Sequence, residues 1–436
     1  MTAEHRITTL QSGVRVVTER VPSVRSVALG FWIGTGSAAE REEQAGISHL
    51  LEHMLFRGTE RFGSEEIDQI FDAMGAEVNA GTDKEGTSLY TRVLDRHLER
   101  AFDVMADMLW QPRFGELEAE REVVLEEIAM YEDDPQDRVF DMLARAVFDA
   151  HPLGRPVIGT AAVVGAVTRP QLAAFHHEHY LPGSIVIAAA GSVDHDALVA
   201  MTRAAEDARD HAAGAPAAPP AQPAFEPRVR FLEKETEQYH VCVGGPGIDR
   251  HDDRRFALRV LEGVLGSTSS SRLFQAVRER RGLAYSVFTF SNLYAHTGEV
   301  GLYVGTRPEN LQEALAVVAE ELQRCVEDPA SEQELTRSRE NLKGRLVLAL
   351  ESTGARMSRL GASVLGELPI LSVNEMLERI DAVGLEQVRE LARELFSPAT
   401  LSVAGVGPTE ERFRAAIEPL AGAPASLPAA GSGWAA

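Results

Sequence analysis

Two stretches of the chain decide its organisation, His49-Leu50-Leu51-Glu52-His53-Met54-Leu55 and Arg259-Val260-Leu261-Glu262-Gly263-Val264-Leu265. Their apolar positions agree, and each has the spacing of an amphipathic helix that follows a strand-like apolar run and a glycine-rich stretch. A second pair of similar segments begins at Glu116-Leu117 and at Glu334-Leu335. The two halves of the chain therefore resemble repeats of one structural unit.

The length of 436 residues exceeds the size at which a single hydrophobic core keeps growing, which favours two domains. A Pro/Ala-rich segment at residues 212–227 divides the chain almost in half and is typical of a linker. We expect one domain over residues 1–211 and a homologous domain over residues 228–420. The Ala/Gly/Pro/Ser-rich residues 421–436 are expected to be a disordered tail.

Within each half, strand-like segments adjacent in sequence are followed by several helical segments. The predicted strands cover residues 27–33, 77–80, 87–93 and 185–190 in the first half, and residues 239–243 and 401–406 in the second. This order predicts the α+β class, with two homologous domains that each contain a mixed, largely antiparallel sheet and helices packed on it.

Composition excludes several functional classes. The chain has 66 acidic and 43 basic residues, a net charge of −23, so nucleic acid is not an expected partner. Its two cysteines, Cys242 and Cys325, exclude a disulfide framework and a thiolate-rich zinc site. Neither a membrane-spanning apolar run nor a secretory signal is visible, so we expect a cytoplasmic protein without a membrane partner. The acidic balance serves solubility or attracts basic peptides.

The segment at residues 49–53 has the pattern of a metal site. On a helix, His49, Glu52 and His53 share one face, where two imidazoles can hold Zn²⁺ and a carboxylate can accept a proton from water. The order H-x-x-E-H is the inverse of the common zinc-peptidase motif. A chain with 13 histidines also produces such pairs by chance, so a buried helix with hydrogen-bonded histidines stays an alternative until a third ligand is found.

The third ligand is expected on the helix predicted over residues 117–131. At about 100° per residue, one face carries Glu120 and Glu127 beside an apolar stripe, and the opposite face carries the other acids. The stripe consists of Leu117, Val124, Ile128 and Tyr131, and the opposite face of Glu118, Glu122 and Glu126. Acids on a buried face are costly unless a cation or hydrogen bonds compensate them, which favours Glu120 and Glu127.

The second half offers a check on these two acids. It has Ser338 and Arg345 where the first half has Glu120 and Glu127. The copy that lacks both histidines therefore also lacks both acids. Metal binding predicts this joint loss, whereas a purely structural role for Glu127 does not.

These residues resemble the pitrilysin-type metallopeptidases, specifically the short two-domain branch that includes mitochondrial processing peptidase and its bacterial relatives. The resemblance covers nearly the whole chain. It includes residues 49–53, 120–127, 151–155, 158–160, 270–274 and 278–286.

The resemblance implies a role for each matching residue. His49, His53 and Glu127 correspond to the ligands of one zinc ion per chain, Glu52 to the general base, and Glu120 to a second catalytic acid that supports the site. Arg278 and Tyr285 correspond to catalytic residues that contact the substrate backbone and the transition-state oxygen. Val78, Asn79 and Ala80 correspond to an edge strand on which the substrate peptide lies. The same donor set would also accept Mn²⁺ or Co²⁺.

The sequence thus predicts a zinc-dependent endopeptidase that hydrolyses peptides or unfolded protein segments, including basic or presequence-like peptides. The resemblance also implies a homodimer, or a heterodimer with a related subunit, in which Arg278 and Tyr285 act at the partner's zinc. Two alternatives remain. The chain could be a catalytically silent scaffold or partner subunit of a processing-peptidase-like complex, or it could only sequester zinc, which would not need Glu52.

Overall fold

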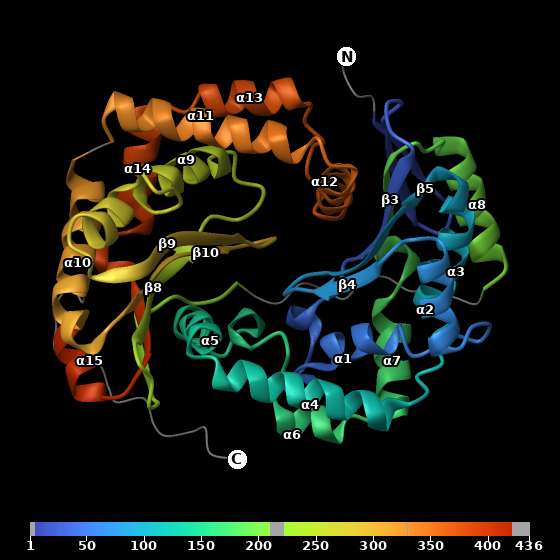
Figure 1. Ribbon diagram of the computed structural model, residues 1–436, viewed down its shortest axis with the longest axis horizontal. Coiled ribbons are helices and arrows are strands. Elements are labelled where there is room, and N and C mark those ends of the chain that lie inside the picture. Colours follow the sequence, from blue (N-terminus) through green and yellow to red (C-terminus); the bar gives the residue numbers. More distant parts are fainter. Residues whose placement is uncertain (1–4, 210–221, 329, 421–436) are drawn as a thin grey trace. The chain divides into compact units, whose positions relative to one another are not determined.

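The computed structural model describes residues 5–209, 222–328 and 330–420. They form two compact units, each with one β-sheet and a set of helices, which confirms the predicted α+β class (Figure 1). The predicted tail and residues 212–221 of the predicted linker lie outside these ranges. Within them, no helix is long and apolar enough to span a bilayer. The cytoplasmic location stays a prediction.

The sheet of the first unit has six strands in the order β1-β2-β6-β3-β5-β4. Their bounds are β1 (His5–Thr9), β2 (Arg15–Arg20), β6 (Ile185–Gly191), β3 (Ser26–Ile33), β5 (Thr87–Leu94) and β4 (Val78–Thr82). The pair β2–β6 is parallel and the other neighbours are antiparallel. This confirms the predicted, largely antiparallel mixed sheet and places β4 at its edge.

Most helices of the first unit contribute to one large apolar core against this sheet. The helices of the unit are α1 (Ile47–Met54), α2 (Ser64–Ala73), α3 (Leu98–Trp110), α4 (Leu117–Asp133), α6 (Ala161–Ala166), α7 (Arg169–His179), α8 (His195–Asp207) and α12 (Thr353–Leu365). The last turn of α4 already belongs to the second unit, which begins at Ala129.

The second unit repeats this architecture with five strands in the order β7-β11-β8-β10-β9. They are β7 (Val229–Glu233), β11 (Ser402–Gly407), β8 (Tyr239–Gly247), β10 (Gly298–Thr306) and β9 (Ala284–Leu293), with β7–β11 parallel and the other neighbours antiparallel. Its helices are α5 (Pro135–Phe148), α9 (Arg255–Leu265), a π-helix (Phe274–Glu279), α10 (Leu311–Glu327), α11 (Glu332–Ala349), α13 (Val373–Asp381), α14 (Leu385–Leu395) and α15 (Glu410–Ala416).

The compact units do not follow the division of the chain at the Pro/Ala segment. One helix from each half of the chain packs on the sheet formed by the other half. Helix α5, from the first half, packs on β11 and β8, whereas α12, from the second half, packs on β6 and β3. Figure 1 shows α12 beside β3 and α5 beside β8. The sequence-based boundaries did not anticipate this exchange.

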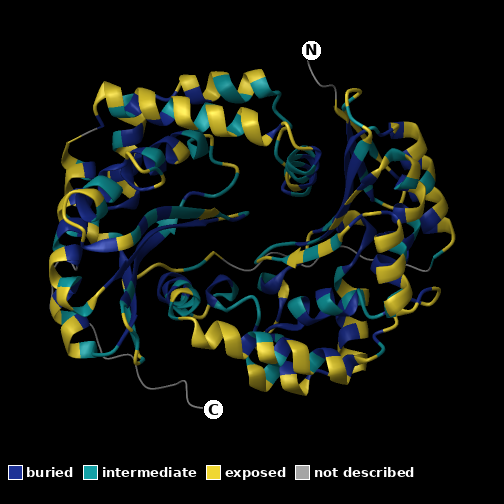
Figure 2. Ribbon diagram, in the orientation of Figure 1, coloured by how far each residue is buried: buried dark blue, intermediate teal, exposed yellow. Residues whose placement is uncertain are grey.

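The exchange explains why β6 is apolar along its whole length. Ile185, Ile187 and Ala189 face the large core, while Val186 and Ala188 face Leu360 and its neighbours on α12. A strand covered on both faces has no polar side, so it reads as a continuous apolar run. Figure 2 shows the central strands in the colour of buried residues and the outer faces of the helices as exposed.

A buried ion-pair cluster fixes α12 on the first sheet. Glu19 of β2 is only 1% exposed and is paired with both Arg356 and Arg359 of α12, the latter at 2.8 Å. Because a buried carboxylate is costly without such partners, the cluster favours this position of α12.

In the second unit, α9 stands where the repeat places the counterpart of α1. Arg259, at the position of His49, donates to Glu262 at 3.0 Å, so the buried acid is neutralised within its own helix. Gly263, at the position of His53, lies against Ser338 of α11, whose hydroxyl donates to the carbonyl of Val260 at 2.8 Å. An ion pair and a close helix contact thus fill the counterpart of the metal motif.

This close contact predicts the effect of Gly263→Ala. In a solvent-exposed helix, alanine is more favourable than glycine by about 1 kcal/mol. At Gly263, however, the new Cβ would overlap Ser338 Oγ and lie 3.2 Å from Ser338 Cβ. We therefore expect a loss of about 1–3 kcal/mol in the free energy of unfolding, measured with urea. In a Ser338→Ala background the loss should shrink or reverse. Stabilisation by Gly263→Ala alone would contradict this packing.

Candidate metal centre

The first turn of helix α1 is held in place by a buried acid, Glu40, which precedes the helix in the sequence. The carboxylate of Glu40 accepts hydrogen bonds from the backbone nitrogens of Gly46, at 2.9 Å, and of Ser48, at 2.8 Å. Burial raises the pKa of Glu40 to about 7. Gly46 has a φ of 96°, which glycine adopts without strain, and a Cβ there would crowd the Ile158 carbonyl. The start of α1 is therefore fixed by contacts of Glu40 and Gly46 that do not involve a metal ion.

The apolar side of α1 is buried in the core through Ile47, Leu50, Leu51 and Met54. His49, Glu52 and His53 share the remaining face. The ring centroids of the two histidines are 4.7 Å apart. The helical spacing predicted from the sequence therefore brings these three side chains together.

Glu127 of α4 completes a group of three metal-ligating side chains. Its Oε2 lies 3.4 Å from His53 Nε2 and 3.7 Å from His49 Nε2. Each residue offers one ligand atom, and these atoms lie within 4.8 Å of one another. Ligand atoms in a tetrahedral zinc site are separated by roughly 3.3–3.5 Å, given bonds of about 2.0–2.2 Å. The donor set and its spacing therefore fit one zinc ion.

The two imidazoles differ in how the protein holds them. His53 Nδ1 lies 2.8 Å from Glu120 Oε1, which leaves Nε2 on the side of Glu127. Nδ1 of His49 is buried and has no hydrogen-bond partner among the described residues. Burial, and secondarily the charge of His53, lowers the pKa of His49 to about 4. At neutral pH His49 is therefore uncharged, which is the form that binds metals.

Glu52 lies on the same helix as the two candidate histidine ligands. It is 9% exposed, and its Oε2 accepts a hydrogen bond of 2.7 Å from the hydroxyl of Thr82. Burial raises the pKa of Glu52, whereas the Thr82 hydrogen bond and the charge of His53 act in the opposite direction. Thr82 therefore orients the carboxylate.

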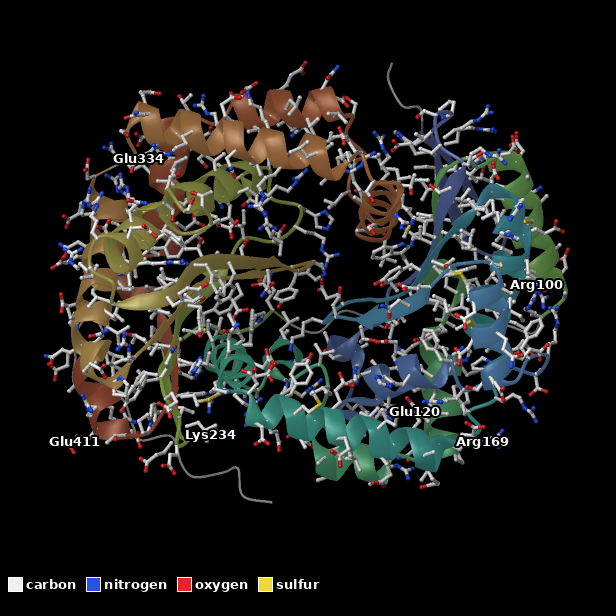
Figure 3. The ribbon with its side chains drawn as sticks, viewed as in Figure 1. Arg100, Glu120, Arg169, Lys234, Glu334 and Glu411 are labelled. Atoms are coloured by element: carbon white, nitrogen blue, oxygen red, sulfur yellow. The ribbon has the colours of Figure 1, made fainter. Side chains whose placement is uncertain are left out.

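Helix α4 exposes its acids in the predicted pattern. Glu120 is buried and Glu127 half-buried, whereas Glu118, Glu122 and Glu126 are exposed. Figure 3 labels Glu120, which lies on α4 beside α1. One prediction for the apolar stripe was wrong, since Tyr131 is 42% exposed. The stripe ends after Ile128, where the chain passes into the second compact unit.

Val78, Asn79 and Ala80 lie on β4, the strand predicted to receive substrate. Strand β4 pairs with β5 and forms that edge of the sheet in the part of the chain that the structure describes. The side chain of Asn79 accepts a hydrogen bond of 2.8 Å from the backbone nitrogen of Ala80. Strand β4 ends at Thr82, whose hydroxyl contacts Glu52, so edge and acid are directly connected.

Arg278 and Tyr285 contact each other in the second compact unit. The guanidinium of Arg278 lies 4.7 Å from the ring centroid of Phe274 and 4.4 Å from that of Tyr285. It also donates to the Tyr285 carbonyl at 3.0 Å. The Tyr285 side chain is 77% exposed. Both residues border a surface pocket of about 380 Å³ that is also lined by Gln238, Gly282, Leu283, Ala284, Gly305, Thr306 and Arg307.

Two contacts of the site were not identified from the sequence. Thr82 could have been found, because alternation along the strand places it on the same face as Val78 and Ala80. The second is Arg57, which is ion-paired with Glu120 Oε2. Nothing in the sequence distinguishes Arg57 from a solvent-exposed arginine.

Comparison with known proteins identifies the family of the chain. Residues 15–161 match insulinase (peptidase family M16), and residues 166–342 match the peptidase M16 inactive domain. A Streptomyces coelicolor protein named as an uncharacterized zinc protease is 42% identical over 93% of this chain and 90% of its own length. A Bacillus subtilis protein named in the same way is 42% identical over 89% of this chain and 95% of its own.

Two solved structures share the fold. One is described as a peptidase M16 inactive domain from Pseudomonas fluorescens, with a TM-score of 0.86 and 22% identity over 93% of this chain and 98% of that one. The other is a protease from Helicobacter pylori, with a TM-score of 0.87 and 20% identity over 94% and 100%. Together with the sequence matches across both halves, these likenesses confirm the predicted resemblance: the chain belongs to peptidase family M16.

Proposed function

We propose that this chain is a zinc-dependent endopeptidase that hydrolyses peptides or unfolded protein segments. The observation that carries the proposal is the convergence of His49, His53 and Glu127 within 4.8 Å. The buried carboxylate of Glu52 stands on the same helix face. The names of the relatives as zinc proteases support zinc as the metal. A site that only stored zinc would not need Glu52 as an additional acid.

In this proposal His49, His53 and Glu127 are the residues that would hold the zinc ion. When bound, zinc supplies Lewis-acid activation of a water molecule and of the scissile carbonyl. The hydrogen bond from His53 Nδ1 to Glu120 fixes the tautomer and the direction of that ring. The three proposed ligands are partly exposed, as a site that admits a substrate requires.

Glu52 is the general base of the proposed reaction. Thr82 orients the carboxylate, which accepts a proton from the attacking water and returns it to the leaving amine. Burial favours the protonated form of Glu52 after the first transfer. One carboxylate can therefore serve as base and then as acid.

The remaining predicted residues are assigned to substrate binding. We propose that the edge of β4 at Val78, Asn79 and Ala80 pairs with an extended peptide. Arg278 and Tyr285 supply donors to the substrate backbone and to the developing oxyanion. The net charge of −23 favours basic or presequence-like peptides among the possible substrates.

The proposed ligand on α4 is tested by Glu127→Ala, with Glu126→Ala as the matched control. Loss of one of the three proposed ligands should weaken zinc binding about 100-fold or more. This exceeds the loss of about 10- to 100-fold that is typical when a residue hydrogen-bonded to a ligand is replaced. Glu126 is exposed, so its loss should leave the affinity within about threefold. Competition with a chromophoric chelator measures both. Equal affinities for the two variants would remove Glu127 from the site.

The proposed base is tested by Glu52→Gln on a quenched peptide. Hydrolysis should fall about 10²- to 10⁴-fold while zinc content is retained, because glutamine keeps the shape but cannot take the proton. Thr82→Val, which removes only the orienting hydrogen bond, should cause a smaller loss. Chelation should abolish activity in the unchanged chain. Hydrolysis that persists both in Glu52→Gln and after chelation would refute a zinc-dependent peptidase with Glu52 as its base. Zinc binding without any hydrolysis would instead favour a silent partner subunit or zinc storage.

We further propose a homodimer in which Arg278 and Tyr285 act at the partner's zinc. Mixing Glu52→Gln chains with Tyr285→Phe chains should then restore partial activity. In a mixed dimer both substitutions fall on one site and the other site is intact, so random mixing should give up to about one quarter of the activity of the unchanged chain. Subunit exchange is monitored by native mass measurement. Mixed dimers without rescue would show that each chain uses its own Tyr285, and a heterodimer would appear as dependence on a second protein.

A further inference from the structure

Arg57 lies one helical turn after His53, at the point where α1 ends. The backbone nitrogens of Phe56 and Arg57 donate to the carbonyls of His53 and Met54, at 3.1 and 3.2 Å, so a turn continues the helix beyond Met54. Gly58, with a φ of 93°, then redirects the chain. Side chains four positions apart project from the same side of such a turn. Arg57 and His53 therefore both reach Glu120 on α4.

The two oxygens of Glu120 are divided between these partners. Oε1 lies 2.8 Å from His53 Nδ1, and Oε2 is ion-paired with Arg57. Within residues 5–209, 222–328 and 330–420, Oε2 receives no hydrogen bond of good geometry, so its compensation is the charge of Arg57. The Glu120 side chain is 4% exposed, and that of Arg57 is 35% exposed. The arginine therefore keeps part of its hydration.

We propose that Arg57 is a positioning residue for the metal centre. By holding Oε2 of Glu120, it keeps Oε1 in place as the acceptor for His53 Nδ1 and so directs Nε2 of His53 toward Glu127. The inference rests on the proposed zinc site and adds to it a residue without contact to metal or substrate.

The charge balance of the site supports this assignment. Glu52, Glu120 and Glu127 together carry three negative charges, and zinc would supply two positive ones. The two imidazoles are neutral when they bind metal. Arg57 brings the total to zero, so no uncompensated charge is left in a partly buried site. Without it, Glu120 would be free to turn or to recruit another donor.

The test compares zinc affinity in full-length variants, measured by competition with a chromophoric chelator. Arg57→Met should weaken zinc binding about 10- to 100-fold, and Arg57→Lys, which keeps the charge without the planar geometry, should lose less. Arg61→Met is the matched control, because Arg61 also neutralises carboxylates, those of Asp103 and Asp107, but contacts none of the site residues. Its zinc affinity should stay within about threefold of that of the unchanged chain. The spectrum of bound Co²⁺ should change in Arg57→Met and not in Arg61→Met.

A double-mutant cycle with Glu120→Gln separates positioning from general stabilisation. If Arg57 acts through Glu120, Arg57→Met should have no further effect on zinc affinity once Glu120→Gln is present. This double variant has no unpaired buried acid, so it and Arg57→Lys keep the test available should Arg57→Met fail to fold.

The outcomes distinguish this inference from the proposed function. If the unchanged chain binds no zinc, both are overturned. If it binds zinc and cleaves peptide, two results overturn the role of Arg57 alone. One is an Arg57→Met chain with unchanged zinc affinity, and the other is an equal loss from Arg57→Met with and without Glu120→Gln.

Discussion

The first unit depends on one electrostatic constraint: three carboxylates and two imidazoles are gathered between α1, α4 and β4 where water cannot fully solvate them. Each acid has its own compensation. Glu120 contacts His53 and Arg57, Glu52 accepts from Thr82, and Glu127 faces both imidazoles. The side chains that face Glu127 in the described part of the chain are two imidazoles, which fits a site completed by a cation.

The second unit shows the same scaffold without this constraint. Glu262 is buried at the position that corresponds to Glu52, but Arg259 neutralises it from the position of His49. Gly263 and Ser338 then bring two helices together where His53 and Glu120 meet in the first unit. A metal motif and an internal ion pair are thus two solutions to one problem, how to keep an acid buried on this helix. At this place the units differ in side chains, because five strands of the first sheet have counterparts in the same order in the second.

Much of the fold and of the centre could be predicted because periodicity reports which face of an element is buried. The repeat, the class and the placement of Glu120 and Glu127 all follow from that rule. The exchange of α5 and α12 could not be predicted in this way. The apolar run of β6 indicates cover on both faces, but the covering helix comes from the other half of the chain and is recognised only through contacts such as Glu19 with Arg356 and Arg359. Arg57 was missed for a related reason. Its ion pair joins the end of α1 to Glu120 on α4, and a contact between two helices does not appear in the hydrophobic periodicity of either one.

Arg278 and Tyr285 mark the limit of such reasoning. The guanidinium of Arg278 is half-buried near the rings of Phe274 and Tyr285, and Tyr285 itself is open to solvent. Burial cannot single out an exposed residue, because exposed arginines and tyrosines are common and cost nothing. A buried acid, by contrast, demands a partner and thereby reveals its site. The candidate ligands could therefore be inferred from physical chemistry and the repeat, whereas Arg278 and Tyr285 were singled out only through family resemblance.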